Sequence, residues 1–234
     1  MAKKVVLQAG HIGRTSGNVG APGEQELNKR ITDRLASILR GKGFEIKQTD
    51  AYADSDTDIT KVDWDLFLAL HGDADIYGTG GGMVDFPEPA SDGATAESQR
   101  IAKCITEEYF KHSEIVNHPE RSNANTRFYY VWDNLTSKTP CVIVEMGVVQ
   151  DAHDKVLLGD TDRIANALAR GVCKAFGVAF DPPPPIPPEP PIVVPEPPSE
   201  VTALREKLFT VKSIIWGKGF VWSRMNKLKG LLPR

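Results

Sequence analysis

Three segments of the 234-residue chain carry a histidine or a carboxylate directly after an apolar run. VVLQAGHIG ends in His11, LFLALHGD contains His71, and CVIVEMG contains Glu145. Such runs are typical of buried strands, and parallel strands present their carboxyl ends at the sheet edge where ligands bind. A single histidine at a strand end is more often a hydrogen-bonded structural residue. Two histidines and a glutamate at equivalent ends instead predict one shared crevice with metal or acid-base chemistry.

A fourth candidate, Glu24, opens a predicted helix. It precedes Leu27 by three residues and Ile31 by seven, so it shares their apolar face, whereas Glu26 points about 200° away. A buried carboxylate needs a partner, and a metal ion supplies one; a helix N-terminal charge favoured by the helix dipole is the alternative. Two neutral imidazoles and one carboxylate leave a fourth position on a tetrahedral zinc ion for water. That arrangement is typical of a catalytic zinc site.

The elements that must position these residues are those of an α/β domain. Short apolar runs alternate with helical patterns, which predicts a mostly parallel central sheet covered by helices on both faces. We expect strands over residues 5–9, 44–48, 66–70 and 141–144, with weaker strands over 82–86 and 127–131. We expect helices over residues 24–40, 94–112 and 161–176.

Composition divides the chain into three parts. Eleven of the 17 prolines fall between residues 182 and 198, where missing amide donors and fixed φ exclude helix and sheet interior. We predict a catalytic domain over residues 1–180, a proline-rich linker over 181–200, and a small helical C-terminal unit over 201–234. A docking site for a proline-binding partner is the alternative for the middle part.

The predicted C-terminal unit is basic and amphipathic. It holds eight Lys or Arg residues and one acid, while the formal charge of the whole chain is −3, so the rest of the chain is acidic. Leu204, Leu208, Val211 and Ile215 share one helical stripe. We expect this unit to attach to an anionic wall polymer or a membrane surface, with self-association or packing on the catalytic domain as alternatives. We do not expect a nucleic-acid partner, because the acidic body would repel phosphate.

Four blocks of the sequence, in order and spacing, resemble the zinc-dependent N-acetylmuramoyl-L-alanine amidases of the type 3 family, found in wall-remodelling enzymes and phage endolysins. The resemblance spans about residues 3–178 and rests on AGHIG, GAPGEQELN, DLFLALHGDAD and TPCVIVEMGVVQDAHDKVLL. It implies one zinc ion held by His11, Glu24 and His71, and a catalytic Glu145. The implied reaction hydrolyses the amide between N-acetylmuramic acid and L-alanine in bacterial peptidoglycan.

Two segments depart from the family pattern, namely GDADIYGTGGGMVDF, which lacks a common asparagine, and RFYYVWDNL. We expect both to line the groove, so the wall chemotype stays open. Arg100, Asn123, Asn125 and Arg127 are candidates for contacting peptide carboxylates or sugar, with surface roles as the alternative. His153 follows the strand of the catalytic glutamate closely, but a loop or capping role is favoured.

Two other functions are compatible with these residue types. A zinc peptidase uses the same residue types, and a non-catalytic wall-binding module would have a degenerate site, although no ligand is missing here. The first residues, MAKK, run straight into an apolar segment too short for a signal peptide, and no run reaches the roughly 18 apolar residues of a membrane span. We therefore expect synthesis in the cytoplasm of a host, as for a phage endolysin, and action at the bacterial cell wall.

Overall fold

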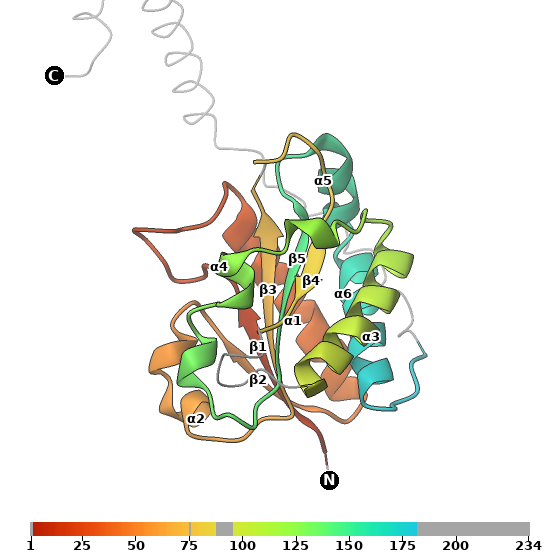
Figure 1. Ribbon diagram of the computed structural model, residues 1–234. Helices are drawn as coiled ribbons and strands as arrows, with labels where there is room; N and C mark the ends of the chain where they lie inside the picture. The colour runs from red at the N-terminus through yellow and green to blue at the C-terminus, as the bar shows by residue number, and fades with distance from the viewer. Residues whose placement is uncertain (1, 75, 88–95, 182–234) are drawn as a thin grey trace, which may run out of the picture. The chain divides into compact units, whose positions relative to one another are not determined.

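The computed structural model describes residues 2–74, 76–87 and 96–181 (Figure 1). The chain divides into two units, residues 1–185 and 186–234, and all described residues belong to the first. The predicted linker and C-terminal unit lie outside the described residues, apart from Asp181. No helix in the described part of the chain has the length and hydrophobicity that a membrane crossing requires.

The centre of the described unit is a five-stranded sheet with the strand order β2-β1-β3-β5-β4. β1, β2, β3 and β5 are parallel to one another, and the short edge strand β4 is antiparallel to β5. The prediction of a mostly parallel sheet is therefore confirmed. The strands are β1 (Lys4–Ala9), β2 (Glu45–Thr49), β3 (Leu66–Asp73), β4 (Met83–Asp85) and β5 (Cys141–Val148).

Helices lie on both faces of the sheet, but unequally. The long helices α1, α3 and α6 pack on one face, whereas short helices and irregular chain cover the other (Figure 1). The α-helices are α1 (Glu24–Gly41), α2 (Thr57–Thr60), α3 (Ala96–Ser113), α4 (Ala124–Arg127), α5 (Ala152–Gly159) and α6 (Thr161–Ala175). Three short 3₁₀ helices are η1 (Ala53–Ser55), η2 (Pro119–Arg121) and η3 (Trp132–Asn134).

The central strands are largely apolar because both faces of the sheet are buried there. In β1, Val5 and Leu7 belong to the core beneath the long helices, while Val6 between them belongs to the core on the opposite face. In β3, Leu68 and Phe67 divide in the same way. Alternate side chains of a strand point to opposite faces, so both faces of these central strands favour apolar residues.

Helix α1 follows from its sequence at both ends. Its first residue, Glu24, is 2% exposed, so the carboxylate lies on the buried face as the spacing predicted. At the other end Gly43 adopts φ 87°, and the amide of Phe44 donates to the carbonyl of Leu39. A glycine in the left-handed region stops the helix without strain and turns the chain into β2.

The weak strand predicted over residues 127–131 is wrong. Arg127 is the last residue of α4, and the following residues form turns that lead into η3. Val131 and Trp132 are fully buried in the core on the face opposite the long helices. The aromatic and β-branched pattern therefore reflects packing against the sheet rather than pairing within it.

A short helix, α5, was not predicted. It begins after Asp151, whose side chain accepts hydrogen bonds from the amides of His153 and Asp154. An aspartate in this position satisfies the free amides of the first helical turn. His153 thus lies in a capped first turn, and it stays exposed.

Candidate metal centre and active site

His11, Glu24 and His71 meet at the carboxyl edge of the sheet. β1 and β3 are parallel neighbours with Ala9 paired to Leu70, so the histidines that follow these positions lie side by side, with ring centroids 4.8 Å apart. Glu24 approaches them from the start of α1. Its Oε1 atom lies 3.3 Å from Nε2 of His11 and 3.5 Å from Nδ1 of His71. One ligand atom from each of the three residues lies within 4.8 Å of the others.

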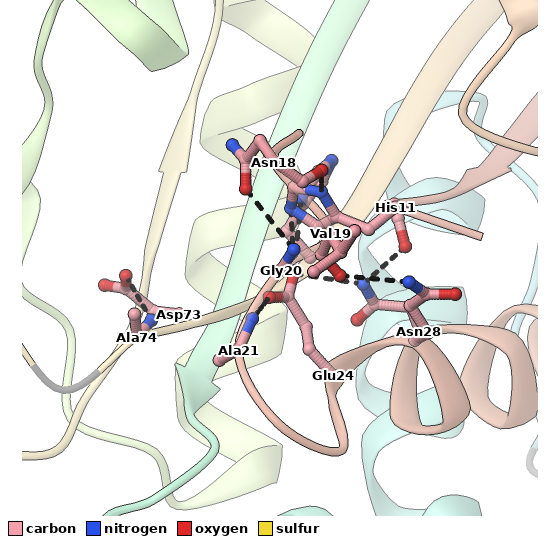
Figure 2. Close-up of polar contacts among 12 residues, drawn as sticks. His11, Asn18, Val19, Gly20, Ala21, Glu24, Asn28, Asp73 and Ala74 are labelled. Atoms are coloured by element: carbon pink, nitrogen blue, oxygen red, sulfur yellow. Dashed lines mark hydrogen bonds and ion pairs between the residues drawn. The ribbon is translucent and has the colours of Figure 1, made fainter. Parts of the chain in front are cut away.

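Glu24 is held in place by hydrogen bonds from two sides. Its Oε2 accepts from the amide of Ala21 at 2.7 Å, and its Oε1 accepts from Nδ2 of Asn28 at 3.2 Å (Figure 2). The same Asn28 nitrogen donates to the carbonyl of Gly10 at 3.0 Å, which ties α1 to the end of β1. The carboxylate therefore has little freedom to leave the two histidines.

The protonation states of Glu24 and His71 are those that a metal needs. Burial opposes ionisation of Glu24, but the polar interaction with His71 and the hydrogen bond from the amide of Ala21 outweigh it, so the pKa of Glu24 is lowered. Burial lowers the pKa of His71, which favours its neutral imidazole. An ionised carboxylate and a neutral imidazole are the forms that coordinate zinc.

The backbone leaves just enough room for the cluster. A Cβ atom on Gly10 would lie 2.5 Å from the ring of His71, and one on Gly20 would lie 2.5 Å from Oε2 of Glu24. His11 itself adopts φ 60°, a left-handed conformation that is uncommon outside glycine. Strain of this kind persists where the surrounding structure enforces it, and it is found more often at functional sites.

The donor set fits a zinc ion. Nδ1 of His11 lies 3.0 Å from the carbonyl oxygen of Asn18, and a carbonyl only accepts, so Nδ1 carries the proton. The lone pair of Nε2 therefore faces the Glu24 carboxylate. Catalytic zinc sites typically have two imidazoles and one carboxylate as ligands. In such sites the imidazole nitrogen that does not bind the metal donates a hydrogen bond to another protein group.

Glu145 lies on the strand next to His71 and pairs with it in the β3–β5 register. Enclosure of its carboxyl by protein, together with the nearby charges of Asp73 and Glu24, raises its pKa well above the usual range. Asp73 shows a raised pKa as well, for which burial is the main cause. The sequence analysis did not single out Asp73, although it lies two residues after His71.

Two cavities, of about 650 Å³ and 440 Å³, open at this cluster. Arg14, Tyr129 and Tyr130 line the larger one, and Ile76 and Tyr77 line the smaller one. Both cavities share six lining residues: His11, Asn18, His71, Asn125, Thr126 and Glu145. The two segments that depart from the family pattern therefore both contribute to the walls, as predicted.

The four predicted substrate contacts are not brought together. Asn125 lines both cavities and Asn123 lines the smaller one, where its side chain also caps α4. Arg127 lines neither cavity. Arg100 is far from the cluster in the fold. Its guanidinium donates to Glu97 and to the carbonyl of Ala175, beside residues at the start of β1 and β3.

The prediction for Arg100 is corrected by this position. The starts of β1 and β3 lie at the sheet edge opposite the histidines, so the side chain does not reach the crevice. The spacing of Glu97 and Arg100, three residues apart on one helix, already indicated an ion pair along the helix surface.

Two further residues, also missed from the sequence, hold the loop beside the smaller cavity. The guanidinium of Arg121 donates to the carbonyls of Thr79, Gly80 and Gly81 at 2.9 to 3.2 Å. Asp154 accepts from the amide of Gly81 at 2.5 Å and from the amide of Val148. These contacts connect parts of the chain about 40 and 70 residues apart, so no local pattern predicts them.

A mostly parallel α/β sheet presents two histidines and two glutamates at its carboxyl edge, an arrangement that suits metal-assisted hydrolysis. Residues 5–175 match the family model described as N-acetylmuramoyl-L-alanine amidase. The chain belongs to this family of enzymes. No curated protein matches it.

Solved structures of similar fold include N-acetylmuramoyl-L-alanine amidases and the catalytic domain of an endolysin. The N-acetylmuramoyl-L-alanine amidase AmiC2 of Nostoc punctiforme has a TM-score of 0.59 at 21% identity, over 75% of this chain and 97% of that one. Ami1 from Mycobacterium smegmatis has a TM-score of 0.60 at 18% identity, over 75% and 97%. The catalytic domain of the CD27L endolysin, described as targeting Clostridia Difficile, has a TM-score of 0.52 at 18% identity, over 74% and 97%.

Proposed function

We propose that the chain hydrolyses the amide between N-acetylmuramic acid and L-alanine of bacterial peptidoglycan with a single zinc ion, held by His11, Glu24 and His71, and with Glu145 as the proton-transfer residue. One observation carries the proposal. A single oxygen of a buried carboxylate faces a nitrogen of each of two histidines, beside Glu145, in a chain of the amidase family.

The ligand atoms are Nε2 of His11, Oε1 of Glu24 and Nδ1 of His71, because these are the atoms that face one another. Three protein ligands leave one position of a tetrahedral ion for water or substrate. A zinc ion in such a site supplies Lewis acidity, which lowers the pKa of water to about 7 and polarises an amide carbonyl.

Glu145 moves the proton. Its carboxylate accepts a proton from the attacking water and returns it to the departing nitrogen of L-alanine. The raised pKa of Glu145 supports this role, because a carboxylate of higher basicity both takes and returns a proton more readily near neutral pH. Position supports it too, since Glu145 lines both cavities and is paired with a ligand on the neighbouring strand.

The walls of the cavities supply the groups that would hold the wall peptide and sugar. Asn125 and Asn123 offer amide groups for hydrogen bonds, and Asn125 is favoured because it lines both cavities. Arg14 offers a positive charge for a peptide carboxylate in the larger cavity, where its guanidinium lies over the ring of Tyr130. Arg127 is the least favoured of the candidates on α4, since it lines neither cavity.

The Glu145→Gln variant tests the proposal. It should keep stoichiometric zinc and lose about 10²- to 10⁴-fold in the rate of sacculus digestion, because general acid-base catalysis contributes that much. Zinc content by atomic emission and release of soluble fragments from purified sacculi are the two measurements. Digestion at the wild-type rate by this variant would refute the role of Glu145, and a wild-type protein that binds no zinc would refute the metal site.

The bond that is cut separates the proposal from its alternatives. An amidase releases peptides that begin with L-alanine and leaves intact glycan, whereas a zinc peptidase cuts within the peptide and leaves L-alanine on the sugar. Mass spectrometry of the released fragments distinguishes the two. A non-catalytic wall-binding module would release nothing while still sedimenting with sacculi.

We further propose that the protein is a phage endolysin with a wall- or membrane-attaching C-terminal unit. Support comes from the endolysin catalytic domain among the similar folds and from the basic, amphipathic sequence of residues 201–234. Cells that express the chain should lyse when chloroform permeabilises their cytoplasmic membrane, and cells with Glu145→Gln should not.

Deletion of residues 182–234 should spare activity on soluble wall fragments and weaken binding to whole cells. Unchanged sedimentation with cells would refute attachment through this unit.

A further inference from the structure

A chain of hydrogen bonds leads from His71 to the backbone on its far side from Glu24. Nε2 of His71 lies 3.3 Å from the hydroxyl of Tyr129, and this hydroxyl lies 3.0 Å from Oε1 of Gln8. Nε2 of Gln8 donates to the carbonyl oxygen of Asp50 at 3.0 Å. Gln8 is fully buried on β1, and His71 is 5% exposed, so water does not substitute easily for these partners.

The carbonyl of Asp50, at the end of this series of hydrogen bonds, determines which atom donates and which accepts in each bond. A carbonyl only accepts, so the amide nitrogen of Gln8 must face Asp50 and its oxygen must face Tyr129. The oxygen of Gln8 accepts the single hydroxyl proton of Tyr129, which is held at neutral pH because a phenol has a pKa of about 10. The hydroxyl oxygen therefore has only lone pairs left for His71.

We propose that Gln8 and Tyr129 act as positioning residues that hold His71 in the tautomer with the proton on Nε2, so that the lone pair of Nδ1 points toward the metal. This inference rests on the zinc site proposed above and deepens it. The hydroxyl of Tyr129 accepts the Nε2 proton, and Gln8 prevents the hydroxyl from turning round to donate. His11 reaches the complementary tautomer through a single contact with the carbonyl of Asn18.

The ring of His71 is confined as well as oriented. It meets His11 and Tyr129 edge-on, with ring centroids 4.8 Å and 5.5 Å away, and it lies against the Cα of Gly10. The ring of Tyr129 is packed edge-on against Tyr130 and Trp132. Packing therefore fixes where both rings lie, and the hydroxyl of Tyr129 at Nε2 competes with the carboxylate of Glu24 at Nδ1 for the ring proton of His71.

The tautomer of His71 can be measured directly in the full-length, metal-free wild-type protein. Long-range ¹H–¹⁵N NMR spectra of histidine rings distinguish a protonated Nε2 from a protonated Nδ1. We expect His71 to show a protonated Nε2 and a free Nδ1. The opposite tautomer in the wild type would overturn the proposal without any variant, whether or not zinc binds.

Two variants test, through zinc affinity, whether Gln8 and Tyr129 position His71. Tyr129→Phe removes only the hydroxyl and keeps the packed ring, while Gln8→Met removes the acceptor and leaves the hydroxyl free to donate to His71. We expect each to weaken zinc binding by about 10- to 100-fold, the usual effect of losing a partner of a ligating histidine. Gln8→Met should in addition move the proton of His71 to Nδ1. Competition with a chromophoric chelator gives the affinities.

Tyr130→Phe is the matched control. Its hydroxyl lies near that of Tyr129 but donates to the carbonyl of Ala51 rather than to His71, so zinc affinity should stay within about twofold of the wild type. Zinc affinity equal to that of the wild type in Tyr129→Phe would overturn the proposed positioning of His71. If the wild type binds no zinc, the proposed function fails instead, and the tautomer measurement still decides whether Gln8 and Tyr129 orient His71.

Discussion

Two clusters of histidine and acidic side chains in the described part of the chain have similar residue types but different surroundings. The first, called the sheet-edge cluster, is His11, Glu24 and His71; the second, called the α5 cluster, is Asp151, His153 and Asp154. The sheet-edge cluster is mostly buried, and its nitrogen lone pairs face a shared carboxylate oxygen. In the α5 cluster, backbone amides donate to one oxygen of each carboxylate, and the histidine is exposed.

The difference teaches that burial and the convergence of ligand atoms, rather than residue type alone, distinguish a metal site from a structural cluster. Asp151 caps α5, and Asp154 joins the amide of Gly81 to that of Val148. The side chain of His153 is 69% exposed and approaches Asp154 only to 3.7 Å. The α5 cluster is therefore a structural joint between the loop after β3 and the end of β5, and it is not proposed as a metal site.

The largest effect should come from removing a ligand of the sheet-edge cluster. His71→Ala should weaken zinc binding by more than about 100-fold, because loss of an outer partner alone costs 10- to 100-fold. Competition with a chelator measures the affinity. His153→Ala is the comparison and should change zinc affinity little, with stability within about 0.5 kcal/mol of the wild type, as for exposed positions. A loss of zinc from His153→Ala would break the distinction between the clusters.

The next effect should fall on stability. Asp154→Ala leaves two buried amides without an acceptor, and each such loss costs about 1–3 kcal/mol. We expect the free energy of unfolding in urea to fall by about 2–5 kcal/mol, while the folded protein still binds zinc. Asp154→Asn keeps an oxygen for both amides and should lose less. If Asp154→Asn releases zinc without loss of stability, the α5 cluster takes part in metal binding after all.

The smallest effect concerns the charge next to the sheet-edge cluster in the metal-free protein. The pKa of Glu145 is raised in the fold, so the folded protein binds more protons there than the unfolded chain, and stability falls as the pH rises above about 4.3. Glu145→Gln removes this loss. We expect the Tm of the metal-free variant to exceed that of the wild type by about 2–4 °C at pH 7.5, for a gain near 1 kcal/mol.

Lower pH checks the cause of that gain. Below about pH 4 the carboxyl of Glu145 is protonated in both folded and unfolded chains, so the difference in Tm should shrink toward zero. A difference that stays constant between pH 3.5 and pH 7.5 would show that packing, rather than charge, separates the variant from the wild type.

Regular elements account for the part of the site that was predicted. Strand alternation and helix periodicity set which side chains share a face, so His71 and Glu145 could be assigned to one crevice, and Glu24 to the buried face of its helix. The structure brings these residues together with His11. The prediction of a strand over residues 127–131 is wrong because these residues form turns whose apolar side chains are buried. Composition does not distinguish buried turns of this kind from a buried strand.

The sequence by itself determined which strands end in a histidine or a glutamate and which face of α1 is buried. Both follow from short-range periodicity. Only the tertiary structure decided what each side chain is bonded to. Tyr129 and Gln8 lie 121 residues apart, and Arg121 and Asp154 reach a loop that neither adjoins. Hydrogen bonds depend on positions in space to within a few tenths of an ångström, and the folded chain sets these positions through contacts that no local pattern contains.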